Sequence, residues 1–381
     1  MMRSRRGVCG GRGCVLVLVV CAGGILLVLP SCYQFFLHTL AQLHQLMSIL
    51  QHPSVCQYPS FFYNETEIKG INSSVVSAGR CLPQPRYLPL PQDNQQDRSL
   101  PYITINRGGR IGNEICQYMS LAVLRKMFGV RASIHGEMEK YIGQFFHRLT
   151  LPVQDSHRSH NYTIKLHYDD IYKTLVTRVN NNGPPPDAPY PYPINQSIYI
   201  YNNPCPPDVL LPFRGQFRQE FTFREDIVDK ARKHIDEAIR MQSHLADKNL
   251  TKITVHVRRK DYIKFLKERF NLEPVEKSYF ERAFDFFRQR VPEPVFLVTS
   301  DEPRWCRENL IQPDVIHVGS NDSVVDLALL TLGDHHVITY GTYGFVGAFL
   351  GRGTIVYPES ENSWPFFRCI NSTIYQPIPR D

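Results

Sequence analysis

The sequence predicts an α/β protein with two Rossmann-like domains, and three observations lead to this fold class. Short apolar runs alternate with segments of helical periodicity, which is typical of parallel sheets with crossover helices. The alternation occurs twice, over residues 101–245 and 250–381. The chain has 381 residues, of which 43% are hydrophobic, so it can fill two domain cores.

The amino-terminal segment predicts a membrane anchor followed by a stem. Residues 1–13 carry arginines and are expected in the cytosol. Residues 14–37 form an apolar run that can cross a hydrocarbon core of about 30 Å. Positive charge before the run places the rest of the chain in the lumen, although a cleaved signal peptide is the alternative. Residues 38–100, rich in Pro, Gln and Asp, are interpreted as a stem.

Sequons and cysteines both fit a lumenal location. Cys32, at the outer end of the anchor, is a candidate for linking two chains into a homodimer. Six further cysteines allow up to three disulfides, or are buried thiols: Cys56, Cys81, Cys116, Cys205, Cys306 and Cys369. Seven Asn-x-Ser/Thr sites follow the anchor and predict N-glycosylation: Asn64, Asn72, Asn161, Asn195, Asn249, Asn321 and Asn371.

The first domain opens with a strand, a glycine turn and a helix. "YITIN" at 102–106 is the strand, "RGGRIGN" at 107–113 the turn, and "EICQYMSLAVLRKMFG" the helix, with Gly129 as its stop. The turn offers Asn113 towards a cleft between the domains, or it is only a tight turn. The proline-rich stretch 180–196 predicts a surface loop.

The second domain repeats the alternation more clearly. An apolar run bounded by turn residues predicts a buried strand, and apolar residues at helical spacing predict a helix. The predicted strands are 252–257, 295–300, 315–318, 336–340 and 354–357, and the predicted helices are 278–291, 324–332 and 344–350.

Positive charge gathers where the first strand of the second domain ends. Arg258, Arg259, Lys260 and Asp261 follow "KITVHV" directly. In open parallel sheets, ligands bind beyond the carboxyl ends of the strands, and the arginine fork suits a diphosphate. The alternative is a surface arginine pair bonded to carboxylates. Basic residues are otherwise scattered and the net charge is only +7, which disfavours nucleic-acid binding.

Other strand ends carry polar residues too. Asp301 could accept a hydrogen bond from a base or sugar, or cap the helix that starts at Pro303. Thr342 and Gly344 lie in a turn before a helix, where backbone N–H groups can hold phosphate, or the turn is only structural. His256 alternates with apolar neighbours, so it is either a core histidine or a ligand contact.

The chain lacks a convincing metal site. "DHH" at 334–336 could suggest one, but it lies where a strand begins, away from the predicted cleft. No Asp-x-Asp is present to hold a nucleotide-sugar diphosphate through a divalent cation. We therefore expect a metal-independent protein in which arginine replaces the cation.

Four motifs together resemble the galactoside alpha-1,2-fucosyltransferases: "GRIGNEICQYMSL", "VHVRRKDY", "PVFLVTSDEPRWCRENL" and "DLALLTLGDHHVITYGTYGFVGAFL". They occur in the family's order between about Ile103 and Tyr357. The resemblance implies a GT-B fold with two domains facing a cleft, a GDP-fucose donor and no metal. It also implies a single-pass type II protein of the Golgi membrane with a lumenal catalytic part.

By this resemblance, fucose passes with inversion from GDP-beta-L-fucose to the 2-hydroxyl of a terminal beta-galactoside. Arg258 and Arg259 match the arginine pair that stabilises the departing diphosphate. The expected donor-binding residues are His256, Asn113, Asp301, Thr342 and Gly344. Asp261 is the candidate base for the acceptor hydroxyl, or it holds one of the arginines, and Glu114 is a more distant candidate base.

The chain departs from the family pattern at two positions. Lys260 stands where the family more often has glycine, and Glu114 where it more often has glutamine. Two other functions stay open: a related transferase with another acceptor or linkage, and a lumenal nucleotide-sugar or glycan-binding protein without catalysis.

Overall fold

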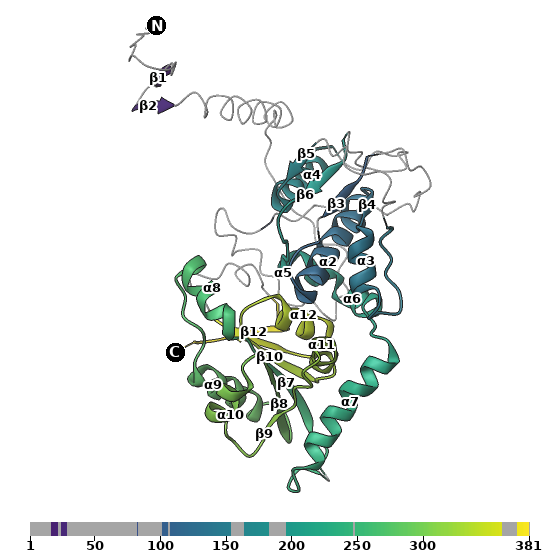
Figure 1. Cartoon of the computed structure of the whole chain (residues 1–381), viewed down its shortest axis with the longest axis vertical. Helices are drawn as coiled ribbons and strands as arrows, with labels where there is room; N and C mark the ends of the chain where they lie inside the picture. The colour runs from purple at the N-terminus through teal and green to yellow at the C-terminus, as the bar shows by residue number, and fades with distance from the viewer. Residues whose placement is uncertain are drawn as a thin grey trace, which may run out of the picture. The chain divides into compact units, whose positions relative to one another are not determined.

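The chain divides into two compact units, Met1–Pro59 and Ser60–Asp381. Both predicted α/β domains lie in the second unit (Figure 1). The computed structural model describes residues 17–21, 24–28, 82, 101–105, 107–153, 164–182, 196–246, 248–359 and 372–380.

The first unit has strands where the sequence predicts a membrane helix. β1 (Val17–Cys21) and β2 (Gly24–Val28) pair in antiparallel fashion, with Cys21 opposite Gly24. Runs of β-branched residues, such as the valines of β1, favour strands. Among the described residues, no helix combines the length and apolarity needed to cross a membrane. The helix expected over 14–37 is thus not what these two stretches form, and the anchor stays a prediction.

A four-stranded parallel sheet lies in the amino-terminal half of the second unit, in the order β4-β3-β6-β5. The central strand β3 is fully buried, as the predicted strand at 102–106 requires. The strands are β3 (Ile103–Ile105), β4 (Ala132–Ser133), β5 (Ile164–Leu166) and β6 (Ile198–Ile200).

The carboxyl-terminal half has a parallel sheet, as the sequence predicts, but the sheet has a sixth strand, β12, beyond the five predicted ones. Its order is β9-β8-β7-β10-β11-β12, which in chain order is the 3-2-1-4-5-6 arrangement of a Rossmann sheet. The order reverses between β7 and β10, so this fold predicts a ligand beyond the carboxyl ends of those two strands. The strands are β7 (Thr251–Val257), β8 (Pro294–Ser300), β9 (Val315–His317), β10 (His335–Ile338), β11 (Ile355–Pro358) and β12 (Tyr375–Ile378).

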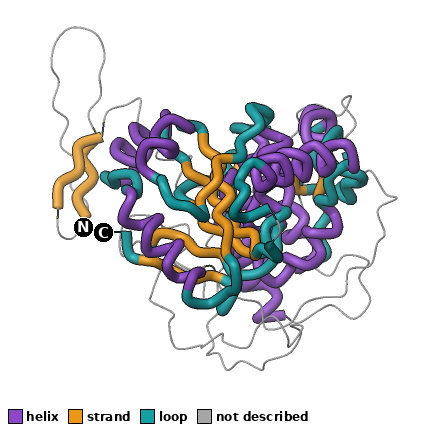
Figure 2. The backbone as a smooth tube through the Cα atoms, turned by 90° about the horizontal axis from the view of Figure 1, so that it is seen from below, coloured by secondary structure: helices purple, strands orange, loops and turns teal. Residues whose placement is uncertain are grey.

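In the second unit, helices pack around the strands of both sheets (Figure 2). In the amino-terminal half they are α2 (Ile111–Phe128), α3 (Gly136–Ile142), α4 (Tyr168–Asn182), α5 (Pro207–Leu210), the 3-10 turn η1 (Leu211–Phe213) and α6 (Arg214–Glu220). The later helices are α7 (Glu225–Arg240), α8 (Lys260–Phe270), α9 (Lys277–Arg288), α10 (Pro303–Asn309), α11 (Ser323–Thr331) and α12 (Thr342–Leu350).

Helix α7 packs on the carboxyl-terminal half, although the predicted first domain extends to residue 245. It contacts α11 and β9. Ile227, Ala231 and Ile235 are buried at four-residue spacing and form one apolar stripe. By packing, the boundary between the halves therefore falls before Glu225.

Three boundaries near the strand ends differ from the prediction. Helix α2 begins at Ile111, so Asn113 lies in its first turn and not in a loop. Helix α12 begins at Thr342, which places Gly344 inside the helix. Helix α8, which the sequence did not predict, begins at Lys260 directly after the two arginines. The helix starts therefore lie closer to the predicted site than expected.

Two further boundaries concern the first half. Gly129 ends α2 in the left-handed conformation, with φ 62°, which confirms the predicted helix stop. Helix α4 continues to Asn182, inside the stretch 180–196 predicted as a loop. Residues 183–195 lie outside the described part of the chain.

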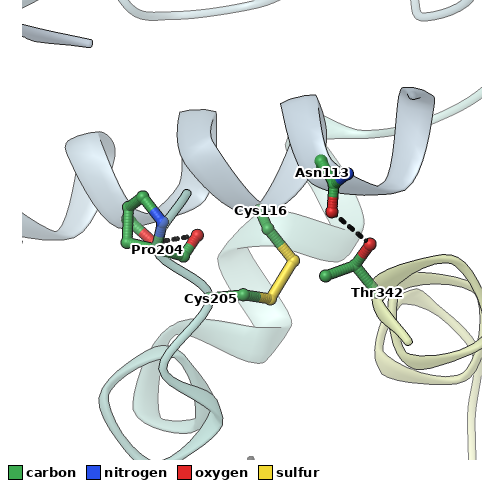
Figure 3. The surroundings of a disulfide bond; sticks show 6 residues. Asn113, Cys116, Pro204, Cys205 and Thr342 are labelled. Atoms are coloured by element: carbon green, nitrogen blue, oxygen red, sulfur yellow. Dashed lines mark hydrogen bonds between the residues drawn. A yellow bond between two sulfur atoms is a disulfide. The ribbon is translucent and has the colours of Figure 1, made fainter. Parts of the chain in front are cut away.

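One disulfide joins Cys116 of α2 to Cys205, with Cα atoms 4.9 Å apart (Figure 3). It ties α2 to the segment that leads into α5. Cys306 is a buried free thiol. Cys32, Cys56, Cys81 and Cys369 lie outside the described residues, so this is the disulfide that the described part contains.

The two halves of the second unit meet where α2 faces α12. Gly112 permits this approach, because a Cβ atom added there would lie 2.7 Å from the Cα of Tyr343. Arg214 of α6 is buried and donates to the carbonyls of Phe349 and Gly351 at 2.8 and 3.0 Å. Both ends of α12 are thus held by the amino-terminal half.

Candidate active site

Arg258 follows β7 at the point where the strand order reverses. Its backbone N–H donates to the Oγ1 of Thr339, 2.9 Å away, just beyond β10. Its guanidinium donates to the carboxylates of Asp261 and Asp301 and lies 5.4 Å from the ring centre of Tyr262. The side chain is 15% exposed. The structure therefore brings Arg258, Asp261 and Asp301 together, as the sequence predicts.

Arg259 points its side chain elsewhere. The guanidinium carbon lies 4.0 Å from the ring centre of Trp305 on α10. Its Nε donates to Glu302 at 3.2 Å and its Nη1 donates to the carbonyl of Val275 at 3.2 Å. The residue is buried. The predicted arginine pair is therefore split between two environments, and Arg259 fastens the loop to the domain core.

Asp301 holds the arginine loop from the end of β8. One oxygen accepts the backbone N–H of Arg259 at 2.9 Å, and the other accepts from the Arg258 side chain. The alternative that Asp301 caps α10 is wrong, because Glu302 occupies the N-cap and makes no side-chain cap bond. Both carboxylate oxygens are thus engaged by the two arginines.

Asp261 lies in the first turn of α8 and is well exposed, at 62% of its side chain. Besides Arg258, it lies 3.9 Å from the Nη2 of Arg110, which is 79% exposed. Arg110 belongs to the glycine turn of the other half. Asp261 therefore stands between cations of both halves.

Lys260 has an unusual backbone conformation. Its φ of 20° is positive, a region that costs an L-residue roughly 1–2 kcal/mol and suits glycine. A glycine at this position would adopt the same backbone conformation without this cost. The Lys260 side chain is exposed.

His256 is buried against the start of α12. Its ring lies 5.0 Å from that of Tyr343, centre to centre, and a Cβ atom on Gly344 would come within 2.5 Å of its Nδ1. Burial lowers the pKa of His256 to about 3, and the charge of Arg258 acts in the same direction. Among the described residues, Nδ1 has no hydrogen-bond partner. His256 is thus a neutral residue enclosed by α12.

The first turn of α12 meets α2 through a direct hydrogen bond. The Oγ1 of Thr342 donates to the Oδ1 of Asn113 at 2.7 Å, and Figure 3 shows the two side chains facing each other from their helices. Gly341, the N-cap of α12, has a φ of 101° and provides no side chain. The helix start therefore presents backbone N–H groups beside the Arg258 loop.

Glu114 is buried completely and paired with Arg107. Its Oε1 accepts from the Nε of Arg107 at 2.8 Å. Burial raises the pKa of Glu114, and the charge of Arg107 opposes that rise. A carboxylate with no exposed surface is poorly placed to act as a base, so the structure gives no support to that alternative.

The three residues of "DHH" each make a hydrogen bond to a different part of the protein and do not converge on one metal site. Asp334 accepts from the backbone of Lys252 at 2.9 Å, and His335 accepts from the backbone of Thr354 at 3.0 Å. His336 bonds the hydroxyl of Thr254 at 2.7 Å. The described part of the chain contains no cluster of three or more histidine, cysteine or acidic residues suited to a metal ion.

Two predicted glycosylation sites fall within the described residues. Asn249 and Asn321 are both exposed, which glycosylation requires. The other five lie outside: Asn64, Asn72, Asn161, Asn195 and Asn371.

Sequence reasoning missed Arg107, Arg110 and Thr339. Arg107 and Arg110 follow β3 as Arg258 follows β7, since both strands are central in parallel sheets. That equivalence was available in "ITINRGGR". The role of Thr339 depends on β10 lying next to β7, which only the strand order reveals.

The comparison with known protein families decides the family. The model described as Glycosyl transferase family 11 matches residues 80–368, which include every candidate catalytic and donor-binding residue named above. The chain belongs to glycosyl transferase family 11. The resemblance predicted from the four motifs is thereby confirmed.

Relatives within glycosyl transferase family 11 are similar over most of the chain. Galactoside alpha-(1,2)-fucosyltransferase 2 of Hylobates lar is 30% identical over 264 residues, 67% of this chain and 70% of that protein. Galactoside alpha-(1,2)-fucosyltransferase 1 of Homo sapiens is 31% identical over 272 residues, 68% of this chain and 69% of that protein. The type 1 enzyme of Rattus norvegicus is 30% identical over 296 residues, 74% of each chain.

Among solved structures, the NodZ alpha-1,6-fucosyltransferase soaked with GDP-fucose is similar, with a TM-score of 0.43 and 12% identity. The match covers 69% of this chain and 97% of that one. A likeness at this distance says nothing about the reaction of the family 11 chain.

Proposed function

We propose that the chain transfers L-fucose from GDP-beta-L-fucose to the 2-hydroxyl of a terminal beta-galactoside. The bond from the fucose anomeric carbon to the diphosphate oxygen breaks, and GDP leaves with the electron pair. The galactose 2-oxygen forms the new bond from the opposite face and loses its proton. Inversion of the beta donor therefore gives an alpha-fucoside. Membership of glycosyl transferase family 11 and the 30–31% identity to galactoside alpha-(1,2)-fucosyltransferases support this reaction.

The observation that carries the proposal is the position of Arg258. It lies at the carboxyl end of β7, where the strand order reverses, and it is held by Asp261, Asp301 and Thr339. A fixed cation stabilises the negative charge that grows on a departing diphosphate without reorganising during the reaction. Arg259 supports the reaction by keeping the loop in place.

The donor diphosphate is proposed to lie between Arg258 and the first turn of α12. Backbone N–H groups at Thr342, Tyr343 and Gly344 suit phosphate oxygens. His256 and Asp301 lie beside this region, and Asn113 closes it from α2. Arg258 and Arg259, each held by carboxylates, and the backbone N–H groups of α12 supply the positive charge that a diphosphate needs. The proposed reaction therefore uses no metal ion and no further cofactor.

Asp261 is the proposed acceptor for the hydroxyl proton. It is exposed and lies between Arg258 and Arg110, so an acceptor can reach it from the amino-terminal half. General base catalysis of this kind contributes typically about 10²–10⁴-fold. The hydrogen bond between Asp261 and Arg258 also keeps the Arg258 side chain in place.

We further propose that the chain is a single-pass type II protein of the Golgi membrane, with residues 38–381 in the lumen. The arginine-flanked apolar run and the exposed Asn249 and Asn321 support this. We expect the chain made in cells to carry N-glycans that an endoglycosidase removes. We also expect its carboxyl-terminal part to be protected from protease added to intact membrane vesicles. Unglycosylated, protease-sensitive chain would contradict the topology.

The reaction is tested with the full-length chain in detergent, ¹³C-labelled GDP-fucose, phenyl beta-D-galactoside and a chelator. NMR of the product should show an alpha linkage to the galactose 2-position. A different linkage would replace the proposed function by that of a related transferase. GDP-fucose binding without transfer to this or other galactosides would favour a non-catalytic binding protein.

A further inference from the structure

Arg107 is an oriented arginine at the carboxyl end of β3 whose outer nitrogen atoms are unused. Its Nε is bonded to the buried Glu114, and its guanidinium carbon lies 4.4 Å from the ring centre of Tyr141 on α3. Among the described residues, neither terminal nitrogen of Arg107 makes a hydrogen bond or ion pair. The side chain is 36% exposed. These two N–H₂ groups are therefore fixed in direction and available.

Arg258 and Arg259 differ from Arg107 in this respect. The outer nitrogens of Arg258 face Asp261 and Asp301, and Arg259 bonds Glu302 and a backbone carbonyl. Arg107 bonds Glu114 through Nε alone, and the second oxygen of Glu114 is buried without a partner among the described residues. Of these three arginines, Arg107 is thus the one that offers its whole outer edge to a ligand.

The turn that starts at Arg107 reaches the junction of the two halves. Gly109 lies against Asn113, since a Cβ atom added to it would come within 2.1 Å of the Asn113 side chain. Asn113 bonds Thr342, and Arg110 lies 3.9 Å from Asp261. The turn that carries Arg107 therefore reaches the amino-terminal rim of the candidate active site.

We propose that Arg107 binds hydroxyl and ring oxygens of the acceptor saccharide, and that Glu114 is the positioning residue that orients it. This inference rests on the proposed function. A guanidinium donates to such oxygens through parallel N–H groups. The carboxylate of Glu114 balances the positive charge of Arg107. The pair therefore suits a neutral saccharide, and the saccharide needs no anionic group. Tyr141 fixes the plane of the guanidinium.

Variants of Arg107 separate acceptor binding from donor binding. In the full-length chain, Arg107→Ala and Arg107→Lys should raise the KM for phenyl beta-D-galactoside, the former about tenfold or more, as for a lost hydrogen bond to a charged group. The affinity of the same variants for GDP, measured by calorimetry, should stay within about twofold of the wild-type value. Retained GDP binding also shows that the variants are folded. An unchanged acceptor KM in both variants, or an equal loss of GDP affinity, would overturn the proposal.

A double-mutant cycle tests the positioning role of Glu114. Glu114→Gln keeps an oxygen that can accept from the Nε of Arg107 but removes the charge, so the acceptor KM should rise severalfold. Added to Arg107→Ala, the same substitution should change nothing further, because Glu114 acts through Arg107. Additive effects would show that Glu114 acts independently and refute the positioning role.

Arg290→Ala is the matched control. Arg290 also stacks on a ring, 4.0 Å from the centre of Phe286, but follows α9 at the opposite ends of the strands. The KM of the Arg290→Ala variant for the galactoside should equal that of the wild type. If the wild type transfers no fucose, the proposed function fails. Saturation-transfer NMR of the galactoside still tests the inference, which is rejected if wild type and Arg107→Ala give equal signals.

Discussion

Arg258 and Arg259 are neighbours in the chain with different physical roles. Arg258 is held near the start of α12 by two carboxylates, whereas Arg259 is buried on Trp305 and bonded to Glu302 and Val275. A guanidinium already fixed by carboxylates keeps its orientation when a diphosphate arrives. At the scale of single residues, the site therefore combines one cation for chemistry with one for support.

Gly344 is required for its small size, because the ring of His256 occupies the space of a side chain. We expect Gly344→Ala to lower the free energy of unfolding by about 1–3 kcal/mol, the usual cost of overpacking. The contact involved is the 2.5 Å approach between the added Cβ and Nδ1. Denaturant unfolding of the full chain measures the effect.

Gly215 provides the control for this substitution. A Cβ atom added at Gly215, in α6, would meet nothing within 4 Å. Gly215→Ala should therefore leave the chain equally stable or stabilise it by up to about 1 kcal/mol, the helix preference for alanine. Equal effects of the two substitutions would show that His256 does not limit the space at Gly344.

At the scale of elements, α12 is the helix on which the site depends. Its first turn bonds α2 through Thr342 and encloses His256, and its last carbonyls accept from the buried Arg214. The helix carries few polar side chains of its own. Its position is therefore set by partners from both halves of the second unit.

Removing Arg214 should loosen this helix. Arg214→Ala leaves the carbonyls of Phe349, Ala348 and Gly351 without this donor, and we expect a loss of about 2–4 kcal/mol in the free energy of unfolding. The KM for GDP-fucose should rise as well, because the proposed phosphate turn moves with the helix. Arg224→Ala, at an exposed ion pair, should change stability by less than about 0.5 kcal/mol. Equal losses in both variants would contradict the role of Arg214.

Elements with long apolar runs can be predicted closely from this sequence. Strands β7 and β8 each begin one residue before the predicted positions, because burial on both faces leaves a continuous apolar signal. Helix α8 escapes prediction, because its buried surface is limited to Leu266. The direction of Arg259 escapes it too, since Val275 and Trp305 are brought to it only by the fold.

At the scale of the whole molecule, each half places arginines at the end of a central parallel strand. Arg107 and Arg110 follow β3, and Arg258 and Arg259 follow β7. The link between Asn113 and Thr342 holds these strand ends near each other. In the proposed reaction, the amino-terminal half thus binds the acceptor and the carboxyl-terminal half binds GDP-fucose. A substitution in the first should mainly affect the galactoside, and one in the second should mainly affect GDP-fucose.

The most direct measurement compares kcat for Arg258→Ala and Arg258→Lys with that of the wild type, at saturating GDP-fucose and galactoside. We expect kcat to fall about 10²–10³-fold in Arg258→Ala, as for loss of one preorganised donor at a developing charge. Arg258→Lys should recover part of the rate, since it keeps the charge but loses the planar fork. If both variants turn over like the wild type while the protein stays folded, Arg258 does not stabilise the departing diphosphate, and the proposed mechanism is wrong.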